Sequence, residues 1–320
     1  MADRWSIYAV QIDDTVDVII GGITAQSLAL GAEVVNDQSS GQVSPEVAYT
    51  AGQRPVANFT SYHVETMLTT LGQFGTSIDD TDGLCLYAQK HLHGGGRTTG
   101  SNHRKYSIVS GMIVPGTLSC NHQEVATMSA NVIVTYDGSN DPVQIATSQA
   151  LPSGALDDER FGLGRVTVES KTLNVQLSGV LKSLTIDFGV EASSEGGGGD
   201  VWDTHASIIT ASPKISFTAT DLEWFTTDTT TIPIEGLALT HDNTVINLRE
   251  YAQANSQVIG HGFTADGSSA HIDITSEGLM VIDDVMNGSQ GSPAEISATI
   301  HPIYDGTNDP LVITTDQTIA

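Results

Sequence analysis

The sequence predicts a mainly β protein built from two tandem copies of an antiparallel β-sandwich or barrel module, each with one flanking α-helix. Three observations lead to this fold class. Short runs rich in Val, Ile and Thr alternate with turn-forming Gly, Asp, Asn and Ser along the whole chain. Residues 129–151 match residues 297–319 at 11 of 23 positions, at an offset of 168. Further matches keep their order through both halves, so the repeat covers the full length.

The repeat divides the chain into two modules. Residues 55–60 (PVANFT) match residues 213–218 (PKISFT), and the offset grows from 156 near the N-terminus to 168 near the C-terminus. We therefore expect a first module over 1–151, a short turn-forming linker over 152–158 and a second module over 159–320. Two similar surfaces in one chain favour assembly into a symmetric object over one asymmetric active site.

Strands are expected wherever β-branched residues cluster or alternate with polar ones, because a half-buried antiparallel strand buries every second side chain. In order along the chain, these stretches are residues 16–20, 132–136, 166–168, 173–177, 184–188, 208–209 and 296–300.

One helix is expected in each module. Residues 61–72 place four apolar side chains at helical spacing, with Thr60 or Ser61 as the N-cap and Gly72 as the stop. In the matching stretch 220–223 of the second half, a Thr is followed three residues later by a Glu, which is typical of a capping box.

Two oxygen-rich turns also repeat between the halves. Asp-Gly between apolar runs favours a tight turn, and Asn-Asp-Pro ends the strand, so a structural role is expected. Calcium binding is the alternative, but the spacing lacks the EF-hand order and its closing Glu. The repeated turn residues are Asp137, Gly138, Asn140, Asp141, Asp305, Gly306, Asn308 and Asp309.

Two polar loops, residues 36–43 and 194–201, align with each other and are expected to project from the modules, where such loops reach a neighbour in an assembly. A third exposed loop is expected at residues 93–100.

The charge of the chain excludes several function classes. With 12 basic and 38 acidic residues the net charge is −26, divided into −8 for residues 1–151 and −18 for residues 152–320. Binding to nucleic acid through a basic patch, or to an anionic membrane, is not expected. No apolar run is long enough to span a bilayer, and the N-terminal residues do not resemble a signal peptide.

The residues do not combine into a catalytic or cofactor site, so no catalytic, cofactor-binding or metal-ligating residue is assigned. The pair His91 and His93, with His103 and His122, matches no zinc spacing. The glycine stretches lack the Lys-Ser/Thr of a phosphate loop, and no Gly-x-Ser-x-Gly elbow is present. The two cysteines, Cys85 and Cys120, are expected as buried thiols.

The early hairpin, the long polar loop, the Pro-x-x-x-Phe-Thr stretch, the single helix and the closing Tyr-Asp-Gly-x-Asn-Asp-Pro strand recur in both halves. This combination resembles the major tail tube proteins of long-tailed (siphovirus-like) bacterial or archaeal viruses, with two tandem tube modules in one chain. The resemblance covers nearly the whole sequence.

The resemblance implies that three chains form a pseudo-hexameric ring, that inner sheets join into one barrel, and that rings stack into a tube whose acidic lumen conducts viral DNA without specific binding. It further implies a virion protein assembled in the host cytoplasm, with the tape measure, terminator and baseplate or tip proteins as partners. The long loops would contact the adjacent ring. Their candidate contact residues are Asn36, Asp37, Gln38, Gly41, Gly196, Gly197, Gly198 and Gly199.

Three other functions stay open. A double-barrel viral capsid protein also makes pseudo-hexamers from two-module chains, and particle shape separates it from a tube. A two-domain surface or adhesive protein would gain stability from calcium. An acidic enzyme from a halophile would unfold at low salt.

Overall fold

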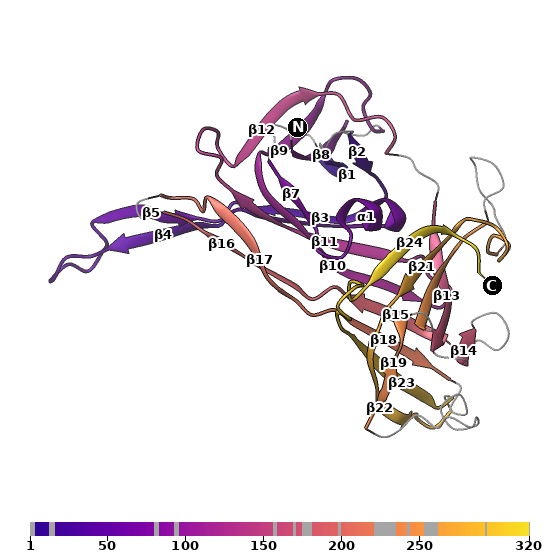
Figure 1. The fold of residues 1–320 in the computed structure, drawn as a ribbon. Helices are drawn as coiled ribbons and strands as arrows, with labels where there is room; N and C mark the ends of the chain where they lie inside the picture. The colour runs from indigo at the N-terminus through magenta and orange to yellow at the C-terminus, as the bar shows by residue number, and fades with distance from the viewer. Residues whose placement is uncertain are drawn as a thin grey trace.

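The computed structural model is a mainly β protein with antiparallel sheets, and it has one α-helix among the residues it describes (Figure 1). This confirms the predicted fold class for its β content and antiparallel pairing, while the internal repeat stays a prediction from the sequence. The described residues are 4–12, 17–79, 83–92, 96–155, 159–168, 171–174, 181–197, 200–220, 235–241, 244–252, 262–291 and 293–319.

A ten-stranded antiparallel sheet runs through both halves of the chain (residues up to 155, and from 159). Its spatial order is β19 (Leu237–Leu239), β22 (Gly278–Asn287), β23 (Glu295–Pro302), β18 (Lys214–Ala219), β15 (Leu181–Asp187), β10 (Ser110–Asn121), β11 (Thr127–Thr135), β6 (Val56–Ser61) and β3 (Ile23–Ala29), with β7 (Thr76–Ile78) paired to β10.

Each half adds a five-stranded antiparallel sheet. The first has the order β12 (Val143–Gln149), β9 (His103–Ile108), β8 (Leu84–His91), β1 (Arg4–Ile12) and β2 (Val18–Ile20). The second has the order β14 (Lys171–Asn174), β13 (Phe161–Val168), β20 (Thr244–Glu250), β21 (His271–Thr275) and β24 (Val312–Gln317). When strands are matched by the sequence alignment, the second order is the first one read in reverse.

The core lies between the ten-stranded sheet and the two smaller sheets. In β6, Ala57 and Phe59 are buried while Asn58 between them is exposed, and β18 shows the same alternation with Ile215 and Phe217 buried. Successive side chains of a strand point to opposite faces, so one face of the large sheet is apolar and buried. The buried apolar residues form one continuous cluster through both halves.

The helix α1 (Val64–Leu71) packs its four buried side chains against β10, β11, β2 and β24. It ends at Gly72, which has a φ of 56°. The predicted N-cap, Thr60 or Ser61, is wrong, because both residues belong to β6 and His63 is at the N-cap position. The Ser61 hydroxyl instead donates to the Gly21 carbonyl (2.5 Å) and accepts the His63 N–H (2.9 Å). In the second predicted helix, residues 221–223 lie outside the described residues.

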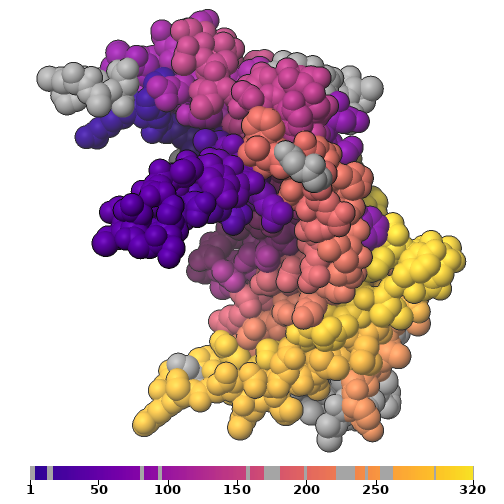
Figure 2. Space-filling view, turned by 90° about the vertical axis from the view of Figure 1, so that its left-hand side faces the viewer, coloured from indigo at the N-terminus to yellow at the C-terminus, as the bar shows by residue number. Residues whose placement is uncertain are grey.

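Two β-hairpins, which we call arms, extend from the body (Figure 1). The first consists of β4 (Ala32–Asp37) and β5 (Val47–Gln53), and the second of β16 (Val190–Glu195) and β17 (His205–Ala211). The sequence predicted long loops here, but the ladders extend into them, so the loops are the tips of paired strands. Figure 2 shows the β4–β5 arm (violet) projecting from the body and the β16–β17 arm (salmon) lying along it.

Candidate assembly surfaces

The two halves are joined by a strand pairing inside the ten-stranded sheet. β10 pairs antiparallel with β15, with Ser119 opposite Thr185 at the centre of the pairing. Just past the end of β15, the Phe188 N–H donates to the Gly116 carbonyl (3.1 Å). We call this contact the internal junction. It buries apolar side chains on the core face, where Leu118 lies opposite Ile186.

The same sheet has open edges toward its two ends. Among the described strands, β3 pairs with β6 alone, and β19 covers β22 only from Gly278 to Met280. The outer side of β22 beyond Met280 therefore carries backbone groups that no described strand pairs. Open edges of this kind are templates for pairing with another chain.

The alignment matches the open edges to the two strands of the internal junction. β22 corresponds to β10, and β3 corresponds to β15. The strand pairings within each half agree with these matches. Two residues that are paired in one half align with two residues that are paired in the other half. The matched pairs are Ser119–Thr127 with Asn287–Glu295, and Thr185–Ser216 with Ser27–Asn58.

Apolar side chains are exposed where the internal junction buries their counterparts. Leu30 and Met286, at the open edges, are 48% and 71% exposed. Their aligned counterparts, Phe188 and Leu118, are 1% and 0% exposed. At an open strand edge, these side chains are accessible to another chain that pairs there. Other exposed apolar residues at or beyond the ends of β22 and β23 are Val285, Ile303 and Tyr304.

The tips of the two arms have the same backbone hydrogen bonds. The Glu46 N–H donates to the Asp37 carbonyl (2.9 Å), and at the aligned positions the Thr204 N–H donates to the Glu195 carbonyl (2.9 Å). A second aligned pair of bonds joins Gln42 N–H to the Ser39 carbonyl (3.1 Å) and Asp200 N–H to the Gly197 carbonyl (3.2 Å).

The tip of the β16–β17 arm docks onto the first half of the same chain. The Gln53 N–H donates to the Val201 carbonyl (2.7 Å), and the Tyr136 N–H donates to the Asp203 carbonyl (2.8 Å). The Trp202 indole N–H donates to the Gln53 side-chain oxygen (3.2 Å). Its ring lies against Tyr136, with 4.9 Å between ring centroids. Backbone bonds and an aromatic contact thus hold this arm to the body.

The Asp203 carboxylate adds two polar contacts to this docking. It forms an ion pair with Arg54 Nε (3.2 Å) and accepts a hydrogen bond from the Ser194 hydroxyl (2.5 Å). The Arg54 side chain is 75% exposed, so solvent screens the ion pair and it contributes little on its own. Asp203 itself is buried, so leaving its carboxylate without these partners would be costly.

The predicted ring-contact residues that the structure describes lie on both arms, and their contact with an adjacent ring stays a prediction. Asn36 and Asp37 end β4, while Gln38 and Gly41 lie in the exposed tip. Gly196 and Gly197 lie in the other tip, whereas Gly198 and Gly199 are outside the described residues. Of the residues that dock within the chain, Val201 ends the predicted loop 194–201, whereas Trp202 and Asp203 were missed. The available signal was a tryptophan where the first copy has Ser44.

The repeated turns are closed by their aspartates. Asp137 Oδ1 accepts the N–H groups of Ser139 and Asn140, both at 2.7 Å. Asp305 accepts the aligned N–H groups of Thr307 (2.6 Å) and Asn308 (2.5 Å). Hydrogen bonds from Asn308 and Thr307 lower the pKa of Asp305 to about 2, and the pKa of Asp137 is lowered for the same reason.

Gly138 and Gly306 have φ of 89° and 96° in these turns, which glycine adopts without strain. Asp141 is an exposed residue beside the first turn. Asp309, beside the second turn, lines a cavity of about 420 Å³ between α1 and β24, together with Gln73 and Leu311.

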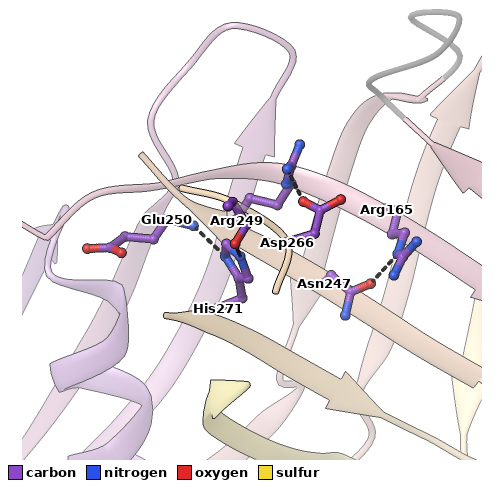
Figure 3. A network of polar contacts seen from close by, with 7 residues as sticks. Arg165, Asn247, Arg249, Glu250, Asp266 and His271 are labelled. Atoms are coloured by element: carbon purple, nitrogen blue, oxygen red, sulfur yellow. Dashed lines mark hydrogen bonds and ion pairs between the residues drawn. The ribbon is translucent and has the colours of Figure 1, made fainter. Parts of the chain in front are cut away.

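Figure 3 shows a network of polar contacts in the second half, which involves side chains of β13, β20 and β21. Arg249, which is buried, pairs with Asp266. His271 accepts the Glu250 N–H at Nδ1 (3.2 Å), and its Nε2 lies 3.1 Å from the Ala265 carbonyl. In the first half, His103 Nδ1 accepts the N–H of Lys90 (3.1 Å), which lies opposite Trp5 on β1 as Glu250 lies opposite Phe161 on β13. The two histidines thus fix the same strand contact in both halves.

Neighbouring polar side chains on β13, β20 and β21 also form hydrogen bonds with one another. Arg165 Nε donates to the Asn247 side-chain oxygen (3.1 Å), and Asn247 donates to Asp273. Burial raises the pKa of Asp273. These contacts join amides, acids and bases to one another, and none aligns a nucleophile with a base.

Among the described residues, no group of three or more His, Cys, Asp or Glu is placed to hold a metal. Within the same residues, no helix is long and apolar enough to cross a membrane. Cys85 and Cys120 are both buried thiols outside a disulfide, as predicted, and burial raises the pKa of Cys120 to about 12.

The face of the ten-stranded sheet away from the core carries a row of hydroxyl groups. Thr127, Ser119, Thr185, Ser216 and Thr299 lie at paired positions on five adjacent strands, from β11 to β23. The Ser216 and Thr299 hydroxyls are 3.0 Å apart. We call these five residues the hydroxyl row.

Charges near the hydroxyl row are few and partly balanced. Asp187 lies opposite Lys214 in the pairing of β15 with β18. At the β22 end, the Thr299 hydroxyl donates to Asp283 (2.6 Å), and Asp284 lies opposite Ser297. The middle of this face is therefore neutral, and acidic groups gather toward the β22 edge.

No protein-family model matches the chain, and no curated protein matches it.

Proposed function

We propose that the chain is a structural virion protein, a major tail tube protein whose copies associate head to tail into trimeric, pseudo-hexameric rings that stack into a DNA-conducting tube. The observation that carries the proposal is the correspondence between the internal junction and the open edges. A strand pairing made once within the chain can be repeated between chains, with β22 of one copy against β3 of the next. A heterologous contact repeated around an axis forms a ring where the rotation closes, and the proposed tube requires that it closes after three chains.

The exposed apolar residues support this association. Pairing of the edges would cover Leu30 and Met286 as the internal junction covers Phe188 and Leu118. Full burial of a side chain of this size contributes about 1.5–3 kcal/mol. Closure of the sheet would also pair the open backbone groups, which removes an aggregation hazard.

The passage of DNA follows from the resemblance together with the hydroxyl row. In a tube, the resemblance places the ten-stranded sheets around the channel with their outer face toward the lumen. The hydroxyl row offers no cluster of Lys or Arg to hold phosphates. A neutral face allows DNA to pass without binding, and the acidic groups near β22 add repulsion.

The remaining parts of the proposal come from the resemblance. The chain acts without catalysis, as part of the virion tail, after assembly in the host cytoplasm. Its partners are further copies of itself and the tape measure, terminator and baseplate or tip proteins.

Negative-stain electron microscopy of the purified chain at high concentration tests the proposal. We expect rings with three-fold symmetry and a central hole that stack into tubes. Hexagonal capsomers or closed shells would replace the proposal with the double-barrel capsid protein. Particles that never exceed one chain would contradict self-association.

A further inference from the structure

We propose that the β4–β5 arm is a latch between neighbouring subunits of one ring. Its tip, residues 42–46, docks onto Ala211, Ser212 and Tyr304 of a second copy of this chain. The inference rests on the proposed head-to-tail association and adds a contact to it. It also moves the predicted role of this loop from the adjacent ring to the lateral neighbour.

The described parts of the two arm tips are closed in the same way. Both are closed by hydrogen bonds at aligned positions, as from Glu46 to Asp37 and from Thr204 to Glu195. One of these tips is seen docked, against Gln53 and Tyr136. A tip closed by the same two backbone hydrogen bonds fits a docking position of the same shape.

The second half has a position equivalent to the one on which the β16–β17 tip docks. Ala211 and Ser212 align with Gln53 and Arg54 at the base of an arm. The Arg54 N–H donates to the Gly31 carbonyl (3.1 Å), and the Ser212 N–H donates to the aligned carbonyl of residue 189 (3.0 Å). Tyr304 aligns with Tyr136, and both come directly before the repeated aspartate turn.

The β4–β5 tip and the surface around Tyr304 are both exposed in the single chain. Val43 at the tip is 95% exposed, and Tyr304 and Ile303 are 61% and 53% exposed. Figure 2 shows the β4–β5 arm (violet) reaching away from the body. The partner of this arm is a second copy of the chain, because edge pairing that repeats the internal junction brings the next copy beside the arm.

The two docking contacts differ in side chains but share backbone groups. Ser44 stands where the docked tip has Trp202, and Pro45 stands where it has Asp203. Proline keeps its carbonyl, so the bond that Tyr136 makes to residue 203 can form again from Tyr304 to Pro45. The indole and the carboxylate have no counterpart. The latch is therefore weaker than the internal docking and suits a contact that forms during assembly.

Cysteine cross-linking of the full chain tests the latch. Ser44→Cys with Ala211→Cys places thiols at the positions that Trp202 and Gln53 occupy in the docked arm. With a short bismaleimide we expect a shift from the monomer band to dimer and trimer bands under denaturing conditions. The matched control, Ser44→Cys with Ser216→Cys, keeps the tip thiol and moves the second one to the hydroxyl row, so it should stay monomeric.

Two further variants separate the outcomes. Gln53→Cys with Trp202→Cys should cross-link within one chain, which shows that the reagent spans the docking contact. Ser27→Cys with Asn287→Cys reports edge pairing alone. Cross-linked edges without a Ser44–Ala211 product would overturn the latch and leave the proposed function standing. Absence of both products would overturn the latch and the self-association together.

Discussion

Ser119 of the first half lies directly opposite Thr185 of the second half, at the centre of the strand pairing that makes the two halves one sheet. Asn287 and Ser27 occupy the aligned positions on the two open edges. In the proposed ring, the β22–β3 pairing between chains would take the same register as the β10–β15 pairing within the chain.

Our first prediction concerns this register. Ser27→Cys with Asn287→Cys should form a disulfide between chains on mild oxidation, because the two positions face each other across the proposed pairing. Gln26→Cys with Asn287→Cys should not, since a shift of one residue turns the side chain to the other face. Non-reducing gels compare the two. Equal yields from both pairs would contradict the register.

The second prediction separates folding from association. Met286→Lys should abolish ring formation and leave unchanged the melting temperature of the single chain, measured below the concentration at which rings form, because Met286 is exposed in the single chain. Leu118→Ala, at the aligned buried position, should lower the free energy of unfolding by about 2–5 kcal/mol. Calorimetry and analytical ultracentrifugation give the two readouts. A large loss of stability in Met286→Lys would show that the side chain already packs within the monomer.

A third prediction strengthens the latch. Ser44→Trp with Ala211→Gln rebuilds between chains the indole–amide bond that Trp202 makes with Gln53 within the chain. Rings of this variant should persist at greater dilution than wild-type rings, as mass photometry can measure. Ser44→Trp alone is the control, since it adds the ring without the amide. Rings that dissociate earlier than wild type would contradict the proposed geometry.

The fourth prediction concerns acid. The pKa of Asp305 is about 2, below its ordinary value of 3.8, so the turn's stabilisation is complete above pH 4 and is lost as the pH falls toward 2. Asp305→Asn keeps a side-chain oxygen that can close the turn and does not titrate. The melting temperature of the wild type should therefore fall more steeply than that of Asp305→Asn between pH 4 and pH 2.5. Parallel curves would show that the Asp305 carboxylate does not contribute to the stability of the turn.

The fifth prediction tests the hydroxyl row. Thr185→Lys with Ser216→Lys should make assembled tubes retain double-stranded DNA at low salt, with an affinity that falls steeply as salt rises. Gln144→Lys with Thr147→Lys adds the same charge on β12, in a smaller sheet, and should retain none in the lumen. Nuclease protection of DNA inside the tubes measures the difference. Equal protection in both variants would place the hydroxyl row outside the channel.

Strand content could be predicted from the sequence because β-branched and alternating residues report the period of a strand directly. The pattern at 132–136 lies largely in β11, and that at 184–188 largely in β15. The start of α1 could not be predicted in this way. Ser61 was assigned to the helix cap, but its hydroxyl bonds the carbonyl of Gly21 on a distant segment. A local pattern contains no information on such a partner.

The candidate surfaces were harder to predict than the strands. The arms were recognised as projecting segments, yet their docking depends on Trp202 meeting Gln53, a contact between residues far apart in the chain. The open edges are a property of strand order, which a single sequence does not report. The clearest sign of the arm docking in the sequence was a departure from the repeat, namely Trp202 where the first copy has Ser44.

Because the internal junction forms when the chain folds, half of the contacts in the proposed ring arise without any collision between molecules. Each bimolecular association costs translational and rotational freedom, estimated at about 4–15 kcal/mol. A ring of three linked pairs needs half the subunits of a ring of six separate modules, so fewer such costs arise and fewer incomplete rings compete. The covalent link also fixes a strict alternation of the two modules around the ring. Each of the two contact types is then free to diverge. Trp202 and Ser44, which are aligned in the sequence repeat, show one such divergence.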